Sequence, residues 1–141
     1  MRAFVDTSTL FKMYYEEAGS EDFKDLLEKI SEIIVSPICW LEMNTTIHRL
    51  LNEKRISREQ VKWLKEEMNR DFQYFSKIIW NENLETAAVE IGSKYYLKTL
   101  DSIQLAASAL SKADLFITSD VKLYREAEKI LKKVQFIGSQ K

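Results

Sequence analysis

Hydrophobic and polar positions define two kinds of segment along the chain. Short runs rich in apolar and β-branched residues, typical of buried strands, occur at residues 2–5, 32–36, 77–80, 114–118 and 134–137. Between them, apolar residues recur three and four positions apart, which predicts helices over residues 10–15, 23–30, 38–51, 61–75, 84–96, 103–110 and 121–131. Because strand and helix alternate, we expect an α/β fold: a three-layer α/β/α sandwich with a central parallel sheet of about five strands.

Residues typical of helix starts mark three of the expected helices. Ser20 stands just before two acidic residues, and Ser57 is followed three positions later by Gln60, the spacing of a capping box. Pro37 suits the first turn of a helix. These signals mark the boundaries of the helices expected over residues 23–30, 38–51 and 61–75.

Composition narrows the class of protein. A chain of 141 residues with 45% hydrophobic residues predicts one domain over residues 1–141. No apolar run approaches the roughly 20 residues of a membrane span, and the first residues lack the pattern of a signal peptide, so we expect a cytoplasmic protein without a membrane segment. A single Cys39 in an apolar context and a single His48 argue against a disulfide, a cysteine nucleophile and a zinc site. Carboxylates are therefore the expected carriers of chemistry.

The net charge of −1 gives no overall sign of nucleic-acid binding, but one segment is basic. Its cations, within residues 49–65, are Arg49, Lys54, Arg55, Arg58, Lys62 and Lys65. A local nucleic-acid patch and a solvated helix surface both fit this segment.

Acidic residues stand at strand ends and helix starts. Asp6 follows the first strand, and Asp120 follows the fourth. Asp101 lies where a helix of small residues begins, and Glu42, next to Leu41 on the expected apolar stripe, is predicted at the boundary of the core. Each acid alone fits a helix cap or a first-turn position. Because ligands of parallel sheets bind at the carboxyl ends of the strands, the four acids together predict a carboxylate cluster at that edge.

Clustered carboxylates need protons or a cation. Two unit charges about 4 Å apart repel by about 4 kcal/mol at an effective dielectric near 20. Oxygen-only ligands favour Mg²⁺ or Mn²⁺ over zinc, and such an ion activates water and shields a scissile phosphate. The hydroxyls of Thr7, Ser8, Thr118 and Ser119 suit either of two roles, orienting the ion's waters or capping helices, and capping is the simpler role for Thr7 and Ser119.

Four segments together resemble the PIN-domain ribonucleases and, among them, the VapC-type toxins of prokaryotic toxin–antitoxin pairs. They are FVDTSTLFKMYYEEAGSE, SPICWLEMNTTIHRL, LKTLDSIQLAASAL and LFITSDVKLYREAE, in the order and spacing of that family. The resemblance implies catalytic, metal-binding acids at four positions, Asp6, Glu42, Asp101 and Asp120, and supporting hydroxyls at Ser8 and Thr118. It further implies a single PIN-like domain that cleaves structured RNA, such as transfer or ribosomal RNA, with Mg²⁺ or Mn²⁺ and a metal-activated water. A VapB-like antitoxin and a homodimer are the partners it implies.

Three basic residues are candidates for contacts with RNA phosphate or an antitoxin carboxylate. Lys12 lies four residues after Ser8 on the same helix face, and Arg49 lies two turns after Glu42. Lys98 occupies a position where the resembled family often has arginine. A solvated or core-edge side chain is the alternative for Lys12 and Arg49.

Two other functions stay open. A PIN-like scaffold would bind RNA or protein without cutting it. A phosphatase-like or receiver-like α/β domain also places an aspartate after its first strand, but the phosphatase needs a second aspartate where Ser8 stands. The receiver needs a phosphorylatable aspartate after its third strand, where Trp80 and Asn81 stand.

Overall fold

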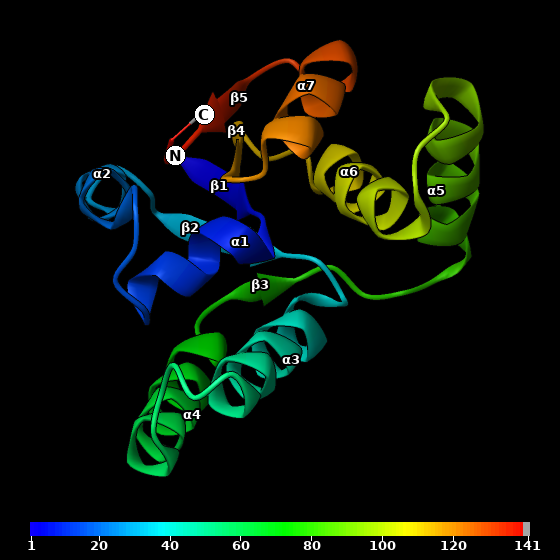
Figure 1. Ribbon diagram of the computed structural model, residues 1–141. Helices are drawn as coiled ribbons and strands as arrows, with labels where there is room; N and C mark the ends of the chain where they lie inside the picture. Colours follow the sequence, from blue (N-terminus) through cyan, green and yellow to red (C-terminus); the bar gives the residue numbers. More distant parts are fainter. Residues whose placement is uncertain (140–141) are drawn as a thin grey trace.

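A five-stranded sheet forms the centre of the computed structural model, which describes residues 1–139 (Figure 1). Its strands are β1 (Arg2–Val5), β2 (Glu32–Val35), β3 (Ser76–Lys77), β4 (Leu115–Thr118) and β5 (Val134–Phe136). They lie in the order β3-β2-β1-β4-β5, and every neighbouring pair is parallel. The predicted parallel sheet of about five strands is confirmed, and the last two positions of the predicted 1–141 domain lie outside the described residues.

Helices cover both faces of this sheet. One face is covered by α1 (Thr7–Leu10), a 3-10 turn η1 (Phe11–Met13), α2 (Ser20–Leu27), α3 (Cys39–Asn52) and α4 (Arg58–Phe72). The other is covered by α5 (Glu82–Tyr95), α6 (Thr99–Ser111) and α7 (Val121–Ile130). Because successive strand residues point to opposite faces, Ala3 and Val5 enter the first core, whereas Phe4 stacks on Phe116 in the second, with ring centroids 5.8 Å apart. This is the predicted three-layer sandwich.

The order of the strands fixes where a site can form. β1 lies between β2 and β4, so the order switches direction at β1. The carboxyl ends of β1 and β4 are adjacent, since Val5 pairs with Ile117 and the backbone N–H of Asp6 donates to the carbonyl of Ile117 at 2.9 Å. In parallel sheets a crevice opens at such a switch point.

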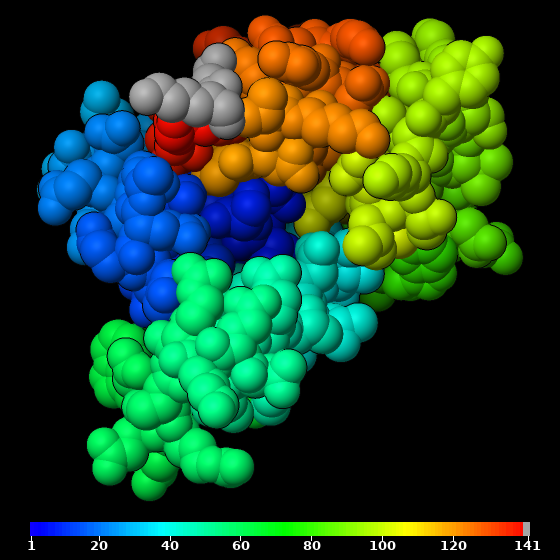
Figure 2. All heavy atoms as spheres, in the orientation of Figure 1, coloured from blue at the N-terminus to red at the C-terminus, as the bar shows by residue number. Residues whose placement is uncertain are grey.

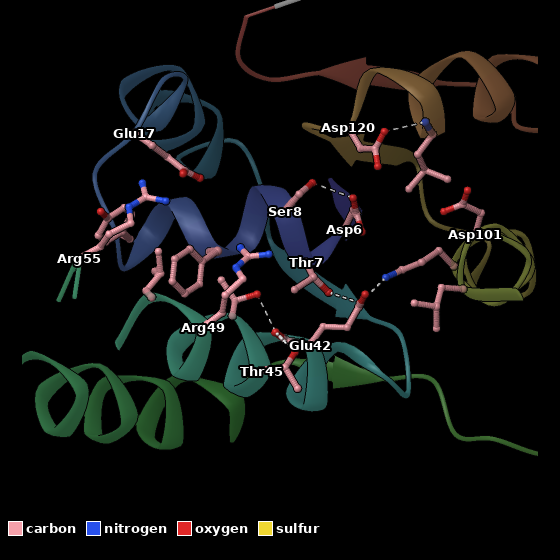
Figure 3. A pocket seen from close by; sticks show the side chains of 17 residues that line it. Asp6, Thr7, Ser8, Glu17, Glu42, Thr45, Arg49, Arg55, Asp101 and Asp120 are labelled. Atoms are coloured by element: carbon pink, nitrogen blue, oxygen red, sulfur yellow. Dashed lines mark hydrogen bonds between the residues drawn. The ribbon is translucent and has the colours of Figure 1, made fainter. Parts of the chain in front are cut away.

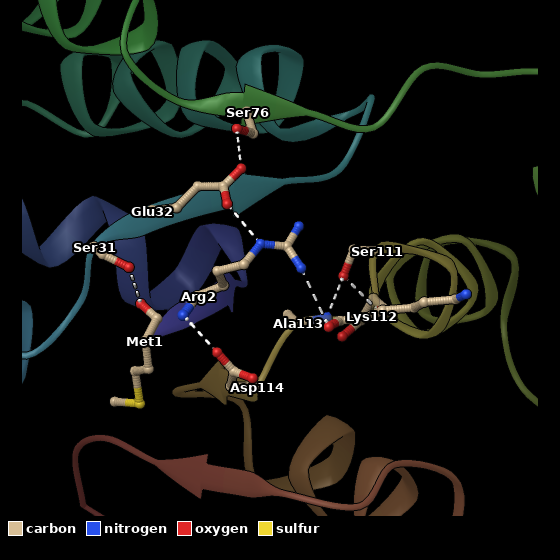
Figure 4. A network of polar contacts seen from close by, with 10 residues as sticks. Met1, Arg2, Ser31, Glu32, Ser76, Ser111, Lys112, Ala113 and Asp114 are labelled. Carbon is tan, nitrogen blue, oxygen red and sulfur yellow. Dashed lines mark hydrogen bonds and ion pairs between the residues drawn. The ribbon is translucent and has the colours of Figure 1, made fainter.

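The opposite edge of the sheet, at the amino ends of the strands, carries a separate polar network (Figure 4). Arg2 Nε donates to Glu32 Oε2 at 2.6 Å, and the hydroxyl of Ser76 donates to Glu32 Oε1. The bond from Ser76 and then that from Arg2 lower the pKa of the Glu32 carboxyl below its ordinary value. Arg2 N also donates to Asp114 Oδ2 at 2.8 Å, so this network joins β1, β2 and β3 to the residue before β4.

The third strand differs from its predicted position. The apolar run at residues 77–80 was interpreted as a buried strand, but β3 is Ser76–Lys77, and the Ile79 and Trp80 side chains are 73% and 48% exposed. β3 is an edge strand that pairs with β2 at two positions only. Beyond Lys77 the ladder ends with Ile78 N donating to the carbonyl of Val35, because β2 itself ends there.

Several helices begin three or four residues before the predicted position, because polar first turns give no apolar periodicity. The helices predicted from residues 10, 23, 61 and 103 begin at Thr7, Ser20, Arg58 and Thr99. The capping box of Ser57 and Gln60 is confirmed by its two reciprocal bonds. The interpretation of Ser20 as a cap is wrong: Gly19 is the N-cap, and Ser20 Oγ accepts from Glu17 N. Pro37 lies two residues before α3 instead of in its first turn.

Gly19 is required by a close approach of two backbone segments. Its φ is +93°, and an added Cβ would lie 2.9 Å from both N and Cα of Gly138, which follows β5. We expect Gly19→Ala to lower the free energy of unfolding by about 2 kcal/mol, because both the left-handed φ and the backbone contact disfavour a side chain. Chemical denaturation measures the change, with the exposed helix substitution Asp25→Ala as control. Equal stability of Gly19→Ala and the wild type would contradict this contact.

Candidate functional site

Five acidic side chains, Glu17 and the four predicted acids, line one pocket of about 520 Å³ at the carboxyl edge of the sheet (Figure 3). Asp6 stands between β1 and α1, and Asp120 is the N-cap of α7 after β4. Glu42 and Asp101 lie in the first turns of α3 and α6. The fold therefore brings together, from four elements, the four acids that the sequence singled out.

Asp6 is the most enclosed of these acids. It is 6% exposed, and its Oδ2 accepts from Ser8 Oγ and from Thr118 Oγ1, each at 2.8 Å. Both hydroxyls that were predicted to support the site thus contact the same carboxylate oxygen. Among the described residues Asp6 Oδ1 accepts no hydrogen bond, which leaves it available to a ligand.

Burial and neighbouring charge act together on this carboxylate. Removal from water raises the pKa of Asp6, the bonds from Ser8 and Thr118 lower it, and the charges of Glu42 and Asp120 raise it; the net result is a shift from 3.8 to about 6. The pKa of Asp101 is also raised, first by burial and then by the charge of Asp120, while nearby lysines oppose this shift. The acids of the pocket are therefore electrostatically coupled.

The hydroxyls also join the ends of β1 and β4. Thr118 Oγ1, fully buried, accepts from Asp120 N at 3.1 Å, and Ser8 Oγ accepts from Ser119 N at 3.2 Å. Asp120 Oδ1 accepts from the backbone N of Leu123, so this acid is both an N-cap and part of the pocket wall.

Glu42 is oriented by two side chains from other elements. Its Oε1 accepts from Thr7 Oγ1 at 2.7 Å and from Gln104 Nε2 at 3.0 Å. The Thr7 hydroxyl therefore donates to an acid of the pocket and does not take the capping role that was the simpler expectation. Gln104 was not among the predicted site residues, although an amide within the small-residue segment LDSIQLAASAL is a signal. Gln104 is 3% exposed, and its Oε1 lacks a partner among the described residues.

Two residues, Asp101 and Leu41, lie in positions that differ from the expected ones. Asp101 is not a cap, because α6 begins at Thr99 with Lys98 as its N-cap. Leu41, placed on the apolar stripe, is 63% exposed, and Met43 and Leu50 take the core positions of α3 with Ile47. The stripe was misassigned because the exposed face of α3 also contains an apolar residue.

The candidate basic residues lie at different distances from the acids. Arg49 lines the pocket, and so does Arg55, which the sequence analysis had placed only in the basic segment (Figure 3). Lys12 does not line it: this side chain is buried and its Nζ donates to Glu17 Oε1 at 3.1 Å. Lys98 is exposed at the start of α6, near enough to Asp101 to lower the pKa of that carboxyl.

Cys39 has the predicted inert character. It is 1% exposed, and burial raises the pKa of its thiol to about 12. The thiol therefore stays protonated at neutral pH, and a cysteine nucleophile is excluded at this position.

The acids provide the oxygen ligands that a divalent cation needs. Their side chains are not yet gathered around one position. Carboxylate oxygens with one unbonded oxygen on Asp6 suit Mg²⁺ or Mn²⁺. Within residues 1–139, however, no three Asp, Glu, His or Cys side chains are grouped closely enough to form a ready metal site. Binding of an ion would need the side chains to draw together, which their mutual repulsion opposes until the ion is present.

Comparison with protein families gives one match: the family model described as PIN domain matches residues 3–129. No curated protein matches the chain. Across residues 1–139, no helix is both long enough and apolar enough to cross a membrane.

Solved structures show the same fold at low sequence identity. A toxin–antitoxin complex from Klebsiella pneumoniae is 19% identical, with a TM-score of 0.67 over 92% of this chain and 96% of that one. FitAcB from Neisseria gonorrhoeae is 13% identical, with a TM-score of 0.72 over 94% and 95%. VapBC2 from Rickettsia felis, bound to a DNA fragment from its promoter, is 12% identical, with a TM-score of 0.67 over 97% and 99%.

Proposed function

The chain belongs to the PIN-domain family, and from this premise we propose that it is a Mg²⁺- or Mn²⁺-dependent endoribonuclease and the toxin of a VapBC-type toxin–antitoxin pair. The proposed substrate is a structured RNA such as transfer or ribosomal RNA. The proposed partners are a VapB-like antitoxin and a second copy of the chain, and the proposed location is the cytoplasm. Residues 1–141 are proposed to act as one PIN-like domain.

One observation carries this proposal: four acids from four elements line a single pocket at the switch point of the sheet. Keeping carboxylates together in a partly buried pocket costs free energy, as the raised pKa values of Asp6 and Asp101 record. Strained or repulsive arrangements of titratable groups are concentrated at functional sites. A divalent cation is the ligand that relieves this repulsion.

Each residue has a proposed role derived from its contacts. Asp6, Glu42, Asp101 and Asp120 would hold the ion, with Asp6 fixed by Ser8 and Thr118, and Glu42 by Thr7 and Gln104. When bound, the ion supplies a polarised water and shields the negative charge of the scissile phosphate. Arg49 and Arg55, also in the pocket wall, would bind phosphate oxygens, which the acids alone repel.

The proposal of an antitoxin partner is supported by the solved structures of the same fold, which include a toxin–antitoxin complex and a VapBC pair. Arg49 and Lys98 offer exposed cations to an acidic antitoxin residue as readily as to RNA. Lys12 could act in this way only if Glu17 released it.

The test is cleavage of total cellular RNA by purified protein free of antitoxin. We expect discrete products with Mg²⁺ or Mn²⁺ and none with chelator, and we expect Asp101→Asn to remove them because it neutralises one of the four acids. Asp114→Asn, at the opposite edge of the sheet, is the matched control and should cleave like the wild type. Mapping the ends of the products identifies the RNA. Folded protein that yields no product with either ion would overturn the nuclease.

A non-catalytic PIN-like scaffold that binds RNA or protein is the second candidate function. The observation in its favour is that, among residues 1–139, no three His, Cys, Asp or Glu side chains are grouped closely enough to hold a metal ion as they stand. Calorimetric titration with Mn²⁺ separates the two functions, because the scaffold predicts the same weak heats for the wild type and for Asp101→Asn.

A further inference from the structure

Three cations form a row along one face of α4. Arg58, Lys62 and Lys65 stand at positions i, i+4 and i+7, which places them on one side of the helix, and Asn69 continues the row. The acids Glu59 and Glu66 lie beside this row, three residues before and four residues after Lys62. The row is therefore a stripe of three cations along two turns of α4, flanked by two acids.

The cations of this stripe are not neutralised within the protein. Among residues 1–139, none of Arg58, Lys62 and Lys65 forms an ion pair with an acidic side chain, unlike Arg70 on the same helix, which pairs with Glu67. The nearest polar partner of Lys65 is itself basic: its Nζ lies 3.1 Å from His48 Nε2 of α3. Lys65 thus donates to a histidine of α3, and the three cations of α4 keep their charge without an acidic partner in the described part of the chain.

The exposed face of α3 connects this stripe to the pocket. Glu42 and Arg49 line the pocket. The neighbouring face of the same helix carries Leu41, Thr45 and His48, which are all exposed, and none of them is acidic. His48 then contacts the α4 stripe. In Figure 2 the two helices form the projecting lower part of the molecule, drawn in turquoise and green. The exposed face of α3 therefore leads from the pocket wall to His48, which contacts Lys65 of α4.

We propose that this α3–α4 basic surface, made of His48, Arg58, Lys62 and Lys65, binds the phosphate backbone of the RNA at nucleotides outside the pocket. The inference rests on the proposed nuclease function and adds the part of the substrate that the pocket cannot hold. None of these four residues lines the pocket, so the contacted phosphates belong to nucleotides beyond the scissile bond. The enzyme thereby favours long or folded RNA over short fragments.

The chemistry of the surface favours RNA over a protein partner. The stripe consists of cations and Asn69, and it lacks the apolar or aromatic anchors that dominate the binding energy of protein interfaces. Repeated cations at similar spacing suit a polyanion, whose binding is supplied by phosphate contacts and displaced counterions.

The experiment measures RNA binding separately from cleavage. Fluorescein-labelled bulk transfer RNA is titrated, without divalent ions, with the Asp6→Asn protein and with the same protein carrying R58Q, K62Q and K65Q. If each lost cation removes one phosphate contact, affinity at 0.15 M salt should fall roughly 50-fold and the slope of log K against log salt should decrease by about 2. A control with K29Q, K94Q and K129Q, three exposed cations on α2's end, α5 and α7, should bind like its parent.

A second measurement uses proteins that retain Asp6. The triple substitution on the α3–α4 basic surface should raise the KM for RNA and leave kcat unchanged, because none of the three residues lines the pocket. Equal RNA affinity of the stripe and control variants would overturn the inference. Loss of binding to poly-glutamate alone, with RNA binding intact, would also overturn it and assign the surface to an acidic protein. Wild-type protein that binds RNA through this surface but cleaves none would support the inference and overturn the proposed nuclease.

Discussion

Asp6→Asn is expected to reduce metal-dependent RNA cleavage about 1000-fold while making the metal-free protein more stable at pH 8. The loss of activity follows because the substitution removes the most enclosed charge of the proposed ion site. The gain in stability follows because the Asp6 carboxylate is buried among other acids, and its pKa is raised to about 6. A shift from 3.8 to about 6 corresponds to about 3 kcal/mol of unfavourable free energy in the charged folded state.

Asparagine is a close substitute in this position. Ser8 and Thr118 both donate to the same oxygen, Oδ2, so the single amide oxygen of asparagine can accept both bonds. The amide NH₂ then has to be accommodated in the place of Oδ1, and for this reason we expect a gain of about 2 kcal/mol instead of the full 3.

The sign of the pH dependence distinguishes this explanation from a packing effect. A carboxyl whose folded pKa exceeds its unfolded pKa binds more protons when folded, so the wild type gains stability as the pH falls from about 6 to 3.8. The variant lacks this contribution. The advantage of the variant should therefore be largest at pH 8, and below pH 4 only the cost of the amide, about 1 kcal/mol against the variant, should remain.

Urea denaturation across this pH range measures the difference, and Asp25→Asn on the exposed face of α2 is the control. Addition of Mg²⁺ should stabilise the wild type and leave Asp6→Asn unchanged, because an ion that binds only the folded state shifts its stability. A variant less stable than the wild type at pH 8 would contradict the coupled carboxylate cluster.

The sequence predicted the architecture because the sandwich depends on patterns that apolar residues carry directly. Ala3, Phe4 and Val5 are all buried, and a run of this kind is typical of a parallel strand covered on both faces. β3 did not follow the same rule. Its run of Ile78, Ile79 and Trp80 is apolar, but its pairing depends on where the neighbouring β2 ends, and no local pattern contains that information.

The candidate site was predictable to the level of its acids, and less so beyond them. Asp6 and Asp120 follow strands, and the topology of a parallel sheet brings such positions together. Gln104 was missed because its partner, Glu42, lies 62 positions away in the sequence. Helical spacing from Ser8 predicted that Lys12 flanks the pocket, but it could not predict the pairing of Lys12 with Glu17, a lining residue that the turn after η1 brings back to it.

The contacts around Asp6 also explain why its pKa is not higher still. Complete burial next to two other carboxylates favours the protonated acid, and the two donated hydroxyl bonds are what lower its pKa back to about 6. Near neutral pH these bonds decide whether the site presents a charge to a cation. The hydroxyl of Thr118 therefore helps to set the charge of the pocket, because its bond lowers the pKa of Asp6.

Thr118→Val tests this role with little change of shape. Thr118 is fully buried, donates to Asp6 Oδ2 at 2.8 Å and accepts from Asp120 N at 3.1 Å. Valine removes both bonds, so we expect the free energy of unfolding at pH 8 to fall by about 3 kcal/mol, and the pKa of Asp6 to rise above about 6. Metal affinity at pH 7 should fall about 10- to 100-fold, because more of Asp6 is protonated and its orientation is lost.

The pH dependence of the metal affinity separates this effect from general destabilisation. Raising the pH returns Asp6 to its charged form, so the deficit of Thr118→Val in Mn²⁺ affinity should shrink between pH 7 and pH 9. Carbon-13 NMR of the Asp6 carboxyl measures the pKa directly. Thr118→Ser keeps the hydroxyl and loses only a buried methyl group, so it should be destabilised by about 1 kcal/mol with a wild-type pKa and affinity. If valine and serine were equally destabilised, with the same pKa of Asp6, the hydroxyl would have no electrostatic role and Thr118 would act through packing alone.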